Sequence, residues 1–462
     1  MSSIINFARA GFVQRSLALC LGVIFSASAA LAQSDGSQQN KTGRAGTFAI
    51  VGAKIVPVSG PTIESGTIVI QNGKIGAVGS GAAVPAGAER IDGKGLTVFP
   101  GLIDAATNLG LVEIPQGLNA SVDVAELGNN NANAKAIRGL HPYSAHVNVT
   151  RVNGITSVVS YPTGGLISGQ AALINLNGST QDDMAVVGEY GLVINFPRIA
   201  GGGGFGGGGG GFGGFGGGQQ TDFNELVRRR DTQVEELKKL FKSAESYLKA
   251  REAYSKDKSL PYVEMDLKYE GMAPYIRGQK PILFTAERER DIRGVAKFIA
   301  DMKVKGVVIG GQEAFKAADV LKQNNIGVIY TNIYNLPVRD DDPYDYLFEA
   351  PSKMQAAGIK YCISTGDSGA EVHDLPYQAG LAASFGLSKE DALKSVTLSA
   401  AEVLGVADKM GSLDTGKIAN VVVADGDILD ARTKIKYIFI GGRMIPLTSR
   451  HTELFDSFKD RK

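Results

Sequence analysis

Side chains that could carry out a reaction gather near residue 367. Asp367 and Ser368 stand in the sequence Gly366-Asp367-Ser368-Gly369, and His373 follows shortly after them. A carboxylate, a hydroxyl and an imidazole at one strand end could exchange protons with a substrate and so support acid–base hydrolysis. We therefore predict Asp367 as the catalytic residue and His373 as a substrate contact. A hydrogen-bonded turn around Asp367 is the alternative interpretation.

Histidine is scarce in the rest of the chain. The 462 residues include four His, at positions 141, 146, 373 and 451. His141 and His146 are separated by a spacing that places them on different faces of a helix. We expect structural or surface roles for them, and this leaves few imidazoles for a metal site.

Composition excludes several classes of protein. The 48 Lys and Arg residues balance 47 Asp and Glu residues, for a net charge of +1, which argues against a nucleic-acid partner. The length is too great for one small domain. Of the two Cys residues, Cys20 lies near the N-terminus and Cys362 far along the chain.

The N-terminus has the pattern of an export signal. Arg9 and Arg15 precede an apolar stretch from Leu17 to Ala30, and Ala30-Leu31-Ala32 matches a cleavage site. The apolar stretch is shorter than the roughly 20 residues of a membrane span, which is the alternative. We predict a signal peptide over 1–32, a linker over 33–46, and a periplasmic or secreted mature chain with no membrane span. Cleavage would leave Cys362 as the one cysteine, without an internal disulfide.

Both ends of the mature chain have β patterns. Short apolar runs separated by Gly, Asn and Pro fill residues 47–99, with Asn72-Gly73 as a hairpin turn. Similar runs return over 408–449, with Gly441-Gly442 as a turn, and a tail follows over 450–462. We expect both ends to form one small β unit.

Between them, residues 100–407 alternate apolar strands with amphipathic helices, which favours a parallel sheet. The predicted strands are Ile155–Tyr161, Leu192–Phe196, Ile282–Thr285, Val307–Ile309, Ile326–Thr331 and Ile359–Ser364, and the predicted helices are Asp291–Met302, Glu313–Gln323 and Pro376–Phe385. A (β/α)8 TIM-like barrel suits this length, with active groups where its strands end. A doubly wound sheet is the alternative, but no glycine-rich dinucleotide turn follows the first strand.

An insertion interrupts the predicted barrel. Residues 201–218 are nearly all Gly, and such a run is typical of a flexible segment. No Gly-Lys-Ser/Thr follows it, so a phosphate loop is not indicated. Residues 221–258 then mix charges of both signs in a pattern that predicts a solvated helix projecting from the barrel.

Two longer motifs are specific. Gly95 to Asp104 reads Gly-Leu-Thr-Val-Phe-Pro-Gly-Leu-Ile-Asp, and the stretch from Gly386 to Asn420 ends in Gly-Ser-Leu-Asp-Thr-Gly-Lys-Ile-Ala-Asn. Together they resemble the amidohydrolase superfamily, and most closely its imidazolonepropionase-like branch. The resemblance implies a distorted (β/α)8 barrel with a β-sandwich built from both chain ends.

The resemblance also implies a metal-dependent hydrolysis, in which one or two divalent ions such as Zn²⁺ activate water. The family's ligands are a His-x-His after the first strand, His after the fifth and sixth strands, and Asp after the eighth. This chain has Ala106 and Asn108, Thr285, and Gly310 at the His positions, and keeps Asp367 at the last. These donors are poor for Zn²⁺, so we predict a degenerate site with no metal ligands and no cofactor.

Two functions remain open. The first is an exported hydrolase of non-peptide carbon–nitrogen bonds, in cyclic amides or similar compounds, with weak or no activity. The second is a non-catalytic module that binds a small molecule or peptide, or assists assembly. Either would hold a small ligand in the barrel mouth, with Asn108, Thr285 and His373 as contacts. By analogy with the family, the chain could form a homo-oligomer.

Overall fold

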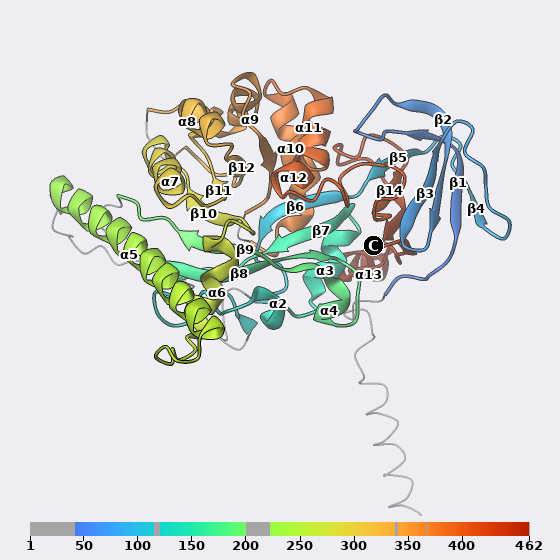
Figure 1. Cartoon of the computed structure of the whole chain (residues 1–462). Coiled ribbons are helices and arrows are strands. Elements are labelled where there is room, and N and C mark those ends of the chain that lie inside the picture. The colour runs from blue at the N-terminus through green and yellow to red at the C-terminus, as the bar shows by residue number, and fades with distance from the viewer. Residues whose placement is uncertain (1–41, 115–120, 200–221, 338–340, 367, 462) are drawn as a thin grey trace, which may run out of the picture.

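The computed structural model describes residues 42–114, 121–199, 222–337, 341–366 and 368–461. The predicted signal peptide, most of the predicted linker, the Gly-rich segment 201–218 and Asp367 lie outside these ranges. The described residues form a barrel-like sheet with helices around it and a separate sheet beside it (Figure 1). No described helix is long and apolar enough to cross a membrane.

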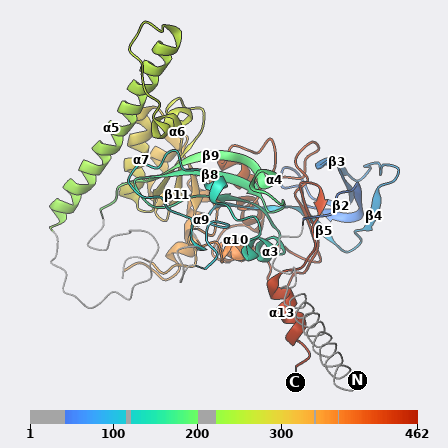
Figure 2. The ribbon, with the colours of Figure 1, turned by 90° about the horizontal axis from the view of Figure 1, so that it is seen from below.

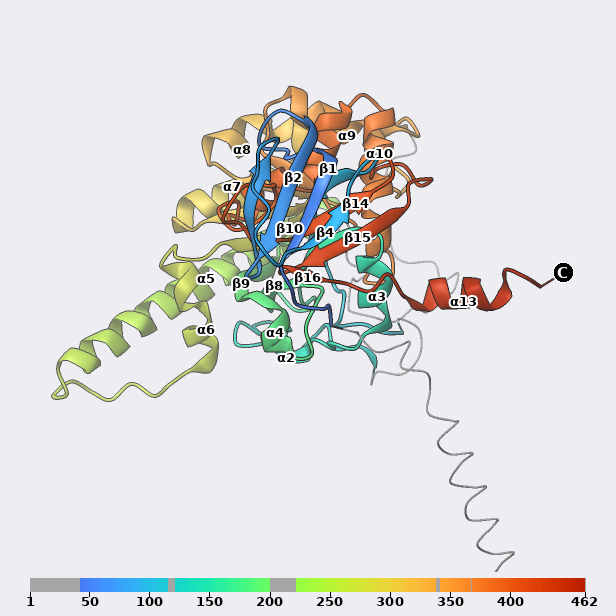
Figure 3. The same cartoon turned by 90° about the vertical axis from the view of Figure 1, so that its right-hand side faces the viewer.

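The separate sheet takes strands from both ends of the chain. Its eight strands are β1 (Phe48–Ile55), β2 (Ile63–Gln71), β3 (Lys74–Gly79), β4 (Glu89–Asp92), β5 (Thr97–Pro100), β14 (Val421–Ala424), β15 (Ile435–Ile440) and β16 (Arg443–Met444). The two halves join where β5 pairs antiparallel with β14. The Phe48 and Phe439 rings, from opposite halves, pack 5.1 Å apart in the core of the sheet. The unit made from both ends is therefore present, as one hydrogen-bonded sheet (Figure 3).

Two hairpin turns, one from the N-terminal strands of this sheet and one from its C-terminal strands, are in direct contact. Asn72 and Gly73 join β2 to β3, and Gly441 and Gly442 join β15 to β16, all four with positive φ as type I′ turns require. A Cβ placed on Gly442 would lie 2.6 Å from Gly73 Cα, whereas one on Gly441 would meet nothing within 4 Å. Gly442 is thus needed both for its backbone conformation and for its small size.

The two glycines give a matched test of this contact. Gly441→Ala is expected to lower the free energy of unfolding by about 1–2 kcal/mol, through left-handed strain alone. Gly442→Ala adds a clash with Gly73 backbone atoms, which cannot rotate away, so we expect at least ~1 kcal/mol more. Urea unfolding of both variants would measure the difference, and equal losses would contradict the contact.

The second sheet forms a nearly closed eight-stranded ring. Its strands are β6 (Leu102–Thr107), β7 (Ile155–Ser160), β8 (Ile167–Asn175), β9 (Ala185–Asn195), β10 (Ile282–Ala286), β11 (Gly306–Gly310), β12 (Gly327–Tyr330) and β13 (Tyr361–Ile363), paired in that order. All six predicted strands are present. The TIM-like barrel is therefore confirmed as the fold class.

One strand departs from a regular (β/α)8 barrel. β8, which the sequence did not predict, runs antiparallel to both β7 and β9. Residues 161–166 are all that separate β7 from β8, and a parallel connection needs a crossover of about a dozen residues or more. The short link therefore turns the chain back on itself.

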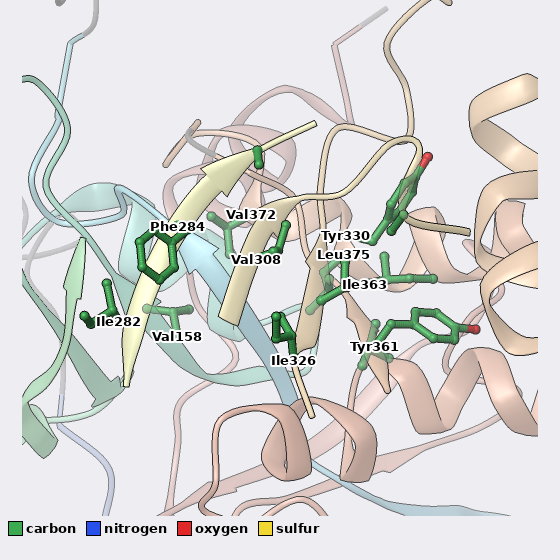
Figure 4. Packing of buried hydrophobic residues seen from close by; sticks show 14 of the residues in the cluster. Val158, Ile282, Phe284, Val308, Ile326, Tyr330, Tyr361, Ile363, Val372 and Leu375 are labelled. Atoms are coloured by element: carbon green, nitrogen blue, oxygen red, sulfur yellow. The ribbon is translucent and has the colours of Figure 1, made fainter. Parts of the chain in front are cut away.

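Alternate residues of the strands build two cores. Leu283, Val307, Ile329 and Cys362 belong to the cluster inside the ring, whereas Phe284, Val308, Tyr330 and Ile363 pack outward (Figure 4). The outer face from β10 to β13 is covered by helices, namely α7 (Glu289–Met302), α8 (Ala318–Gln323), α9 (Tyr346–Ala356), α10 (Leu375–Ser384) and α11 (Lys389–Ser395). The inside of the barrel is therefore packed with side chains.

The described part of the chain contains further helices, most of them short. They are α2 (Ala136–Gly139), α3 (Ala145–Arg151), α4 (Gln181–Met184), α6 (Leu267–Ile276), α12 (Leu398–Val403) and α13 (Arg450–Phe458). The long charged helix α5 (Phe223–Lys256) projects along one side of the barrel (Figure 2). It is less solvated than predicted, because Leu237, Phe241, Ala244 and Leu248 are buried along one stripe. Phe241 packs edge-on against Phe298 of α7, at 5.3 Å between ring centroids.

Candidate functional site

The barrel has one edge where most of its strands end, and this edge is where barrel enzymes place their reactive groups. Asn195, Thr285 and Ile309 stand at the same level of three neighbouring strands, β9, β10 and β11. Further round the ring, the residues after β13 lie beside the end of β6. The edge has two separate parts, because β6 and β10 lie on opposite sides of the ring.

The first part is the seam between β6 and β13, where the ring has no backbone ladder. Asp104, fully buried on β6, bridges this gap. Its carboxylate accepts hydrogen bonds from the Ser364 hydroxyl, from the Thr365 hydroxyl (2.5 Å) and from the Thr365 N–H (3.3 Å). The Ser364 hydroxyl oxygen also accepts from the Ala106 N–H at 2.9 Å. The Asp104 carboxyl group therefore connects β6, the first barrel strand, with the residues that follow β13, the last.

Burial dominates the electrostatics of the seam. It raises the pKa of Asp104 from 3.8 to about 6, against the opposing effect of the hydrogen bonds from Ser364 and Thr365. Burial, together with the charge of Asp104, also raises the pKa of the Cys362 thiol, which is wholly inaccessible. A buried thiol that resists ionisation is not a nucleophile. The seam is consequently a structural centre.

Asn108 sits just beyond the seam and holds the loop that follows β13. Its side-chain oxygen accepts the Gly369 N–H at 2.6 Å, and nearby the Gly366 N–H donates to the Ala106 carbonyl at 3.2 Å. The predicted catalytic Asp367 falls between these two anchored positions, outside the described residues. Because its oxygen is engaged with the backbone, Asn108 supports the loop and is a poor candidate for a substrate contact.

The second part of the edge lies across the ring, at β9 and β10. The Thr285 hydroxyl donates to the Asn195 side-chain oxygen at 3.2 Å, and the Asn195 amide donates to Gly165 O at 2.8 Å. Thr285 is half-buried and lies one residue before the end of β10. Asn195 was not predicted as a site residue, although it lies within the predicted strand Leu192–Phe196.

Glu287 follows Thr285 and occupies the space over Gly310. A Cβ on Gly310 would lie 3.1 Å from Glu287 Cγ and 2.8 Å from the Ala286 carbonyl oxygen. Gly310 also has a φ of +109°, which residues with a side chain rarely adopt. The Glu287 backbone is fixed, because its carbonyl accepts the Glu313 N–H at 2.9 Å. The absence of a side chain at 310 thus makes room for the Glu287 side chain, which is partly exposed.

His373 lies elsewhere. Its Nδ1 is 2.9 Å from the Ala370 carbonyl, and its ring meets that of His451 on α13 at 6.0 Å. The Asn153 amide, at the end of α3, donates to its carbonyl oxygen. These contacts turn it toward the C-terminal helix, and among the described residues no hydrogen bond joins the His373 ring to Thr285 or Asn108.

The residues present do not fit a histidine-ligated metal pair. The Ala106 methyl group is buried in the apolar interior, the Thr285 hydroxyl is bonded to Asn195, and Gly310 offers no donor atom. Within the described ranges, no three His, Cys, Asp or Glu side chains come close enough to hold a metal ion. Hydroxyl and neutral amide groups are weak ligands for transition metals.

Comparison with known proteins agrees with this fold. Residues 348–445 match the family model described as the amidohydrolase family. An amidohydrolase from Thermotoga maritima MSB8 has a similar structure, with a TM-score of 0.72 at 23% identity over 86% of this chain and 99% of that one.

Two other solved structures are more distant. A prolidase complexed with N-methylphosphonate-L-proline has a TM-score of 0.51 at 16% identity, over 86% of this chain and 99% of its own. A molinate hydrolase has a TM-score of 0.50 at 17% identity, over 88% and 96%. No curated protein matches the chain. The chain therefore shares its fold with these solved structures.

Proposed function

We propose that this protein is an exported hydrolase of the amidohydrolase family, acting on a non-peptide carbon–nitrogen bond in a small cyclic amide or similar compound. The family match over residues 348–445 and the barrel support the class of reaction. The assignment to the imidazolonepropionase-like branch rests on the two sequence motifs alone.

The observation on which the mechanism rests is the placement of Glu287. Glu287 is partly exposed, its Cγ lies close to Gly310, and Thr285 precedes it by two positions. Its carboxylate can accept the proton of a water molecule that attacks the amide carbon. The carbon–nitrogen bond then breaks, and the leaving nitrogen takes up the proton that Glu287 accepted. Thr285 can orient the substrate, and Asp367 keeps its sequence-based assignment as a second acid–base group.

Turnover by such a site is expected to be slow. A metal ion both activates water and polarises the carbonyl. Glu287 can replace the first of these effects, whereas Thr285 and Asn195 offer only neutral groups for the second. The small substrate would sit at the barrel edge above Thr285.

Export rests on the N-terminal pattern. Basic residues, an apolar stretch and Ala30-Leu31-Ala32 support cleavage after Ala32 and a periplasmic or secreted location.

A single preparation tests these proposals. The protein is purified from the exported fraction, and its intact mass should correspond to a chain beginning at Gln33. The metal content is measured, and the protein is assayed with a panel of lactams, hydantoins and cyclic ureas, before and after treatment with a chelator. Slow turnover that survives chelation is expected. Stoichiometric Zn²⁺ with activity abolished by chelation would overturn the proposed site, and no turnover of any compound would overturn the proposed reaction.

A further inference from the structure

A cavity of about 320 Å³ lies between the long helix α5 and α6, on the part of the molecule that projects from the barrel (Figure 3). This volume is at the lower end of the range of about 300–1,000 Å³ that is typical of small-molecule sites. Neither Glu287 nor Thr285 lines the cavity, so it is distinct from the proposed reaction site. Its charged lining residues are Arg251, Glu252, Lys258, Glu270 and Arg277.

The two carboxylates of this lining are already paired. Glu270 accepts a hydrogen bond from the Tyr247 hydroxyl at 2.9 Å, and its Oε1 lies 3.4 Å from Arg251 Nε. Glu252 accepts a hydrogen bond from Lys256 Nζ at 2.7 Å, and this bond lowers the pKa of the Glu252 carboxyl group. Each lining carboxylate therefore has a cation of its own, and the cavity does not favour a cationic ligand.

The other two cations of the lining have no carboxylate within ion-pair distance among the described residues. Lys258 Nζ lies over the Tyr254 ring, 4.1 Å from its centroid, which positions the ammonium group without neutralising its charge. The Arg277 guanidinium makes no hydrogen bond in the described part of the chain, and its charge only adds to the effect of Lys256 on the pKa of Glu252. Guanidinium and ammonium groups with unused donors bind carboxylates and phosphates. The cavity therefore favours an anion.

An aromatic rim adjoins the cavity. Tyr262, which is 68% exposed, packs edge-on against the Tyr254 ring at 5.4 Å between centroids. The segment that carries Tyr262 is held in place, because the Arg251 guanidinium donates to the Val263 carbonyl at 3.1 Å. Leu248 of α5 supplies an apolar part of the lining. The site thus offers apolar surface as well as charge, which favours an organic anion over an inorganic one.

We propose that this cavity binds a small organic oxyanion, a carboxylate or a phosphate ester, through Lys258 and Arg277 beside the ring of Tyr262. Both cations are exposed, so the affinity is modest and falls as the salt concentration rises. Both also follow the C-terminal end of a helix, where a positive charge stabilises the helix even without a ligand. Binding measurements and melting temperatures together separate these two roles.

Calorimetric titration of the full chain with benzoate and with phenyl phosphate tests the site, and benzyl alcohol is the neutral comparison. One binding site is expected for at least one of the anions, and none for benzyl alcohol. Arg277→Gln and Lys258→Gln should each weaken binding about fivefold to tenfold, as expected when an exposed charge-assisted hydrogen bond is lost. The tighter of the two anions identifies the ligand as a carboxylate or as a phosphate ester.

Lys242→Gln is the matched control. Lys242 is an exposed cation of α5 that has no ion pair among the described residues and does not line the cavity, so its replacement should leave the affinity unchanged. Glu287→Gln should also bind the anions as the wild type does, because the cavity is independent of the proposed reaction. Failure of the wild-type chain to bind either anion would exclude the site. So would glutamine variants at 258 and 277 that melt at a lower temperature but bind as tightly as wild type, since the two cations would then serve only the helix ends.

Discussion

Replacing Asp104 by alanine is expected to lower the free energy of unfolding by about 3 kcal/mol at pH 5. Asp104 is the buried acceptor for the Ser364 and Thr365 hydroxyls and for the Thr365 N–H across the seam. A buried donor left without an acceptor costs roughly 1–3 kcal/mol, and the two hydroxyls can recover part of this loss by rotating. Guanidinium unfolding of the two proteins measures the difference. Asp92→Ala, which removes an exposed carboxylate from β4, is the control and should cost less than about 0.5 kcal/mol.

The free energy of unfolding that Asp104→Ala loses should become smaller as the pH rises. Burial raises the pKa of Asp104 to about 6 in the folded protein, above the 3.8 of a free carboxyl group. The folded state therefore holds this proton more tightly, and the resulting stability is complete below about pH 3.8 and lost as the pH rises through about 6. Below about pH 3.8 the binding of this proton contributes about 3 kcal/mol to the stability of the folded state. At pH 5, one unit below the folded pKa, about 1.4 kcal/mol of that contribution remains.

Wild type and Asp104→Ala should thus differ by about 1.4 kcal/mol less at pH 7.5 than at pH 5. Other titrating groups cancel in this comparison, because both proteins contain them. A difference that is constant with pH would show that Asp104 is not a buried proton-binding group. A difference near zero at both values would show that the seam does not depend on it.

Glu287→Gln is expected to lower kcat/KM by about 10²–10⁴-fold on whichever cyclic amide the protein hydrolyses. Glutamine preserves the shape over Gly310 but cannot accept a proton from water, and a positioned base contributes a factor of this size. Unchanged melting temperature and circular dichroism would show that the fold is intact. The loss should appear in kcat more than in KM, since the group acts on the reacting water.

Glu289→Gln is the matched control for charge. Glu289 lies two positions further on, in the first turn of α7, where it pairs with Arg293 at 2.9 Å. Removing its charge should change kcat/KM less than about threefold. Full activity in Glu287→Gln would remove Glu287 from the mechanism, and an equal loss in both variants would indicate a general effect of charge.

The sequence was sufficient to predict the layout of the fold. Apolar runs located six of the eight barrel strands, because buried parallel strands are continuous in hydrophobicity. Asn72-Gly73 and Gly441-Gly442 located the hairpins at both chain ends. β8 was missed, since Gly169 and Gln170 interrupt its apolar pattern, and its reversed direction follows from the short link before it.

The site was harder to predict, because its decisive contacts join distant residues. Asp104 stood in a recognised motif, yet its partners Ser364 and Thr365 follow the last barrel strand, about 260 residues later in the sequence. The placement of Glu287 depends on the left-handed backbone at Gly310, which no local pattern reveals. Thr285 and Gly310 lie at the ends of β10 and β11, and the His373 ring contacts His451 of α13, a contact that the sequence did not indicate.

The pairing of β5 with β14 has a consequence for how the chain folds. Positions 100 and 421 are partners in this ladder, so the sheet cannot be completed until nearly the whole polypeptide is available. Contacts between such distant positions require a large loop to close first, which slows folding. Until then β5 leaves an unpaired edge that can bind other chains. A newly made chain would therefore be most vulnerable to aggregation just before the residues of β14 become available, and loss of β14 would leave β5 without its antiparallel partner.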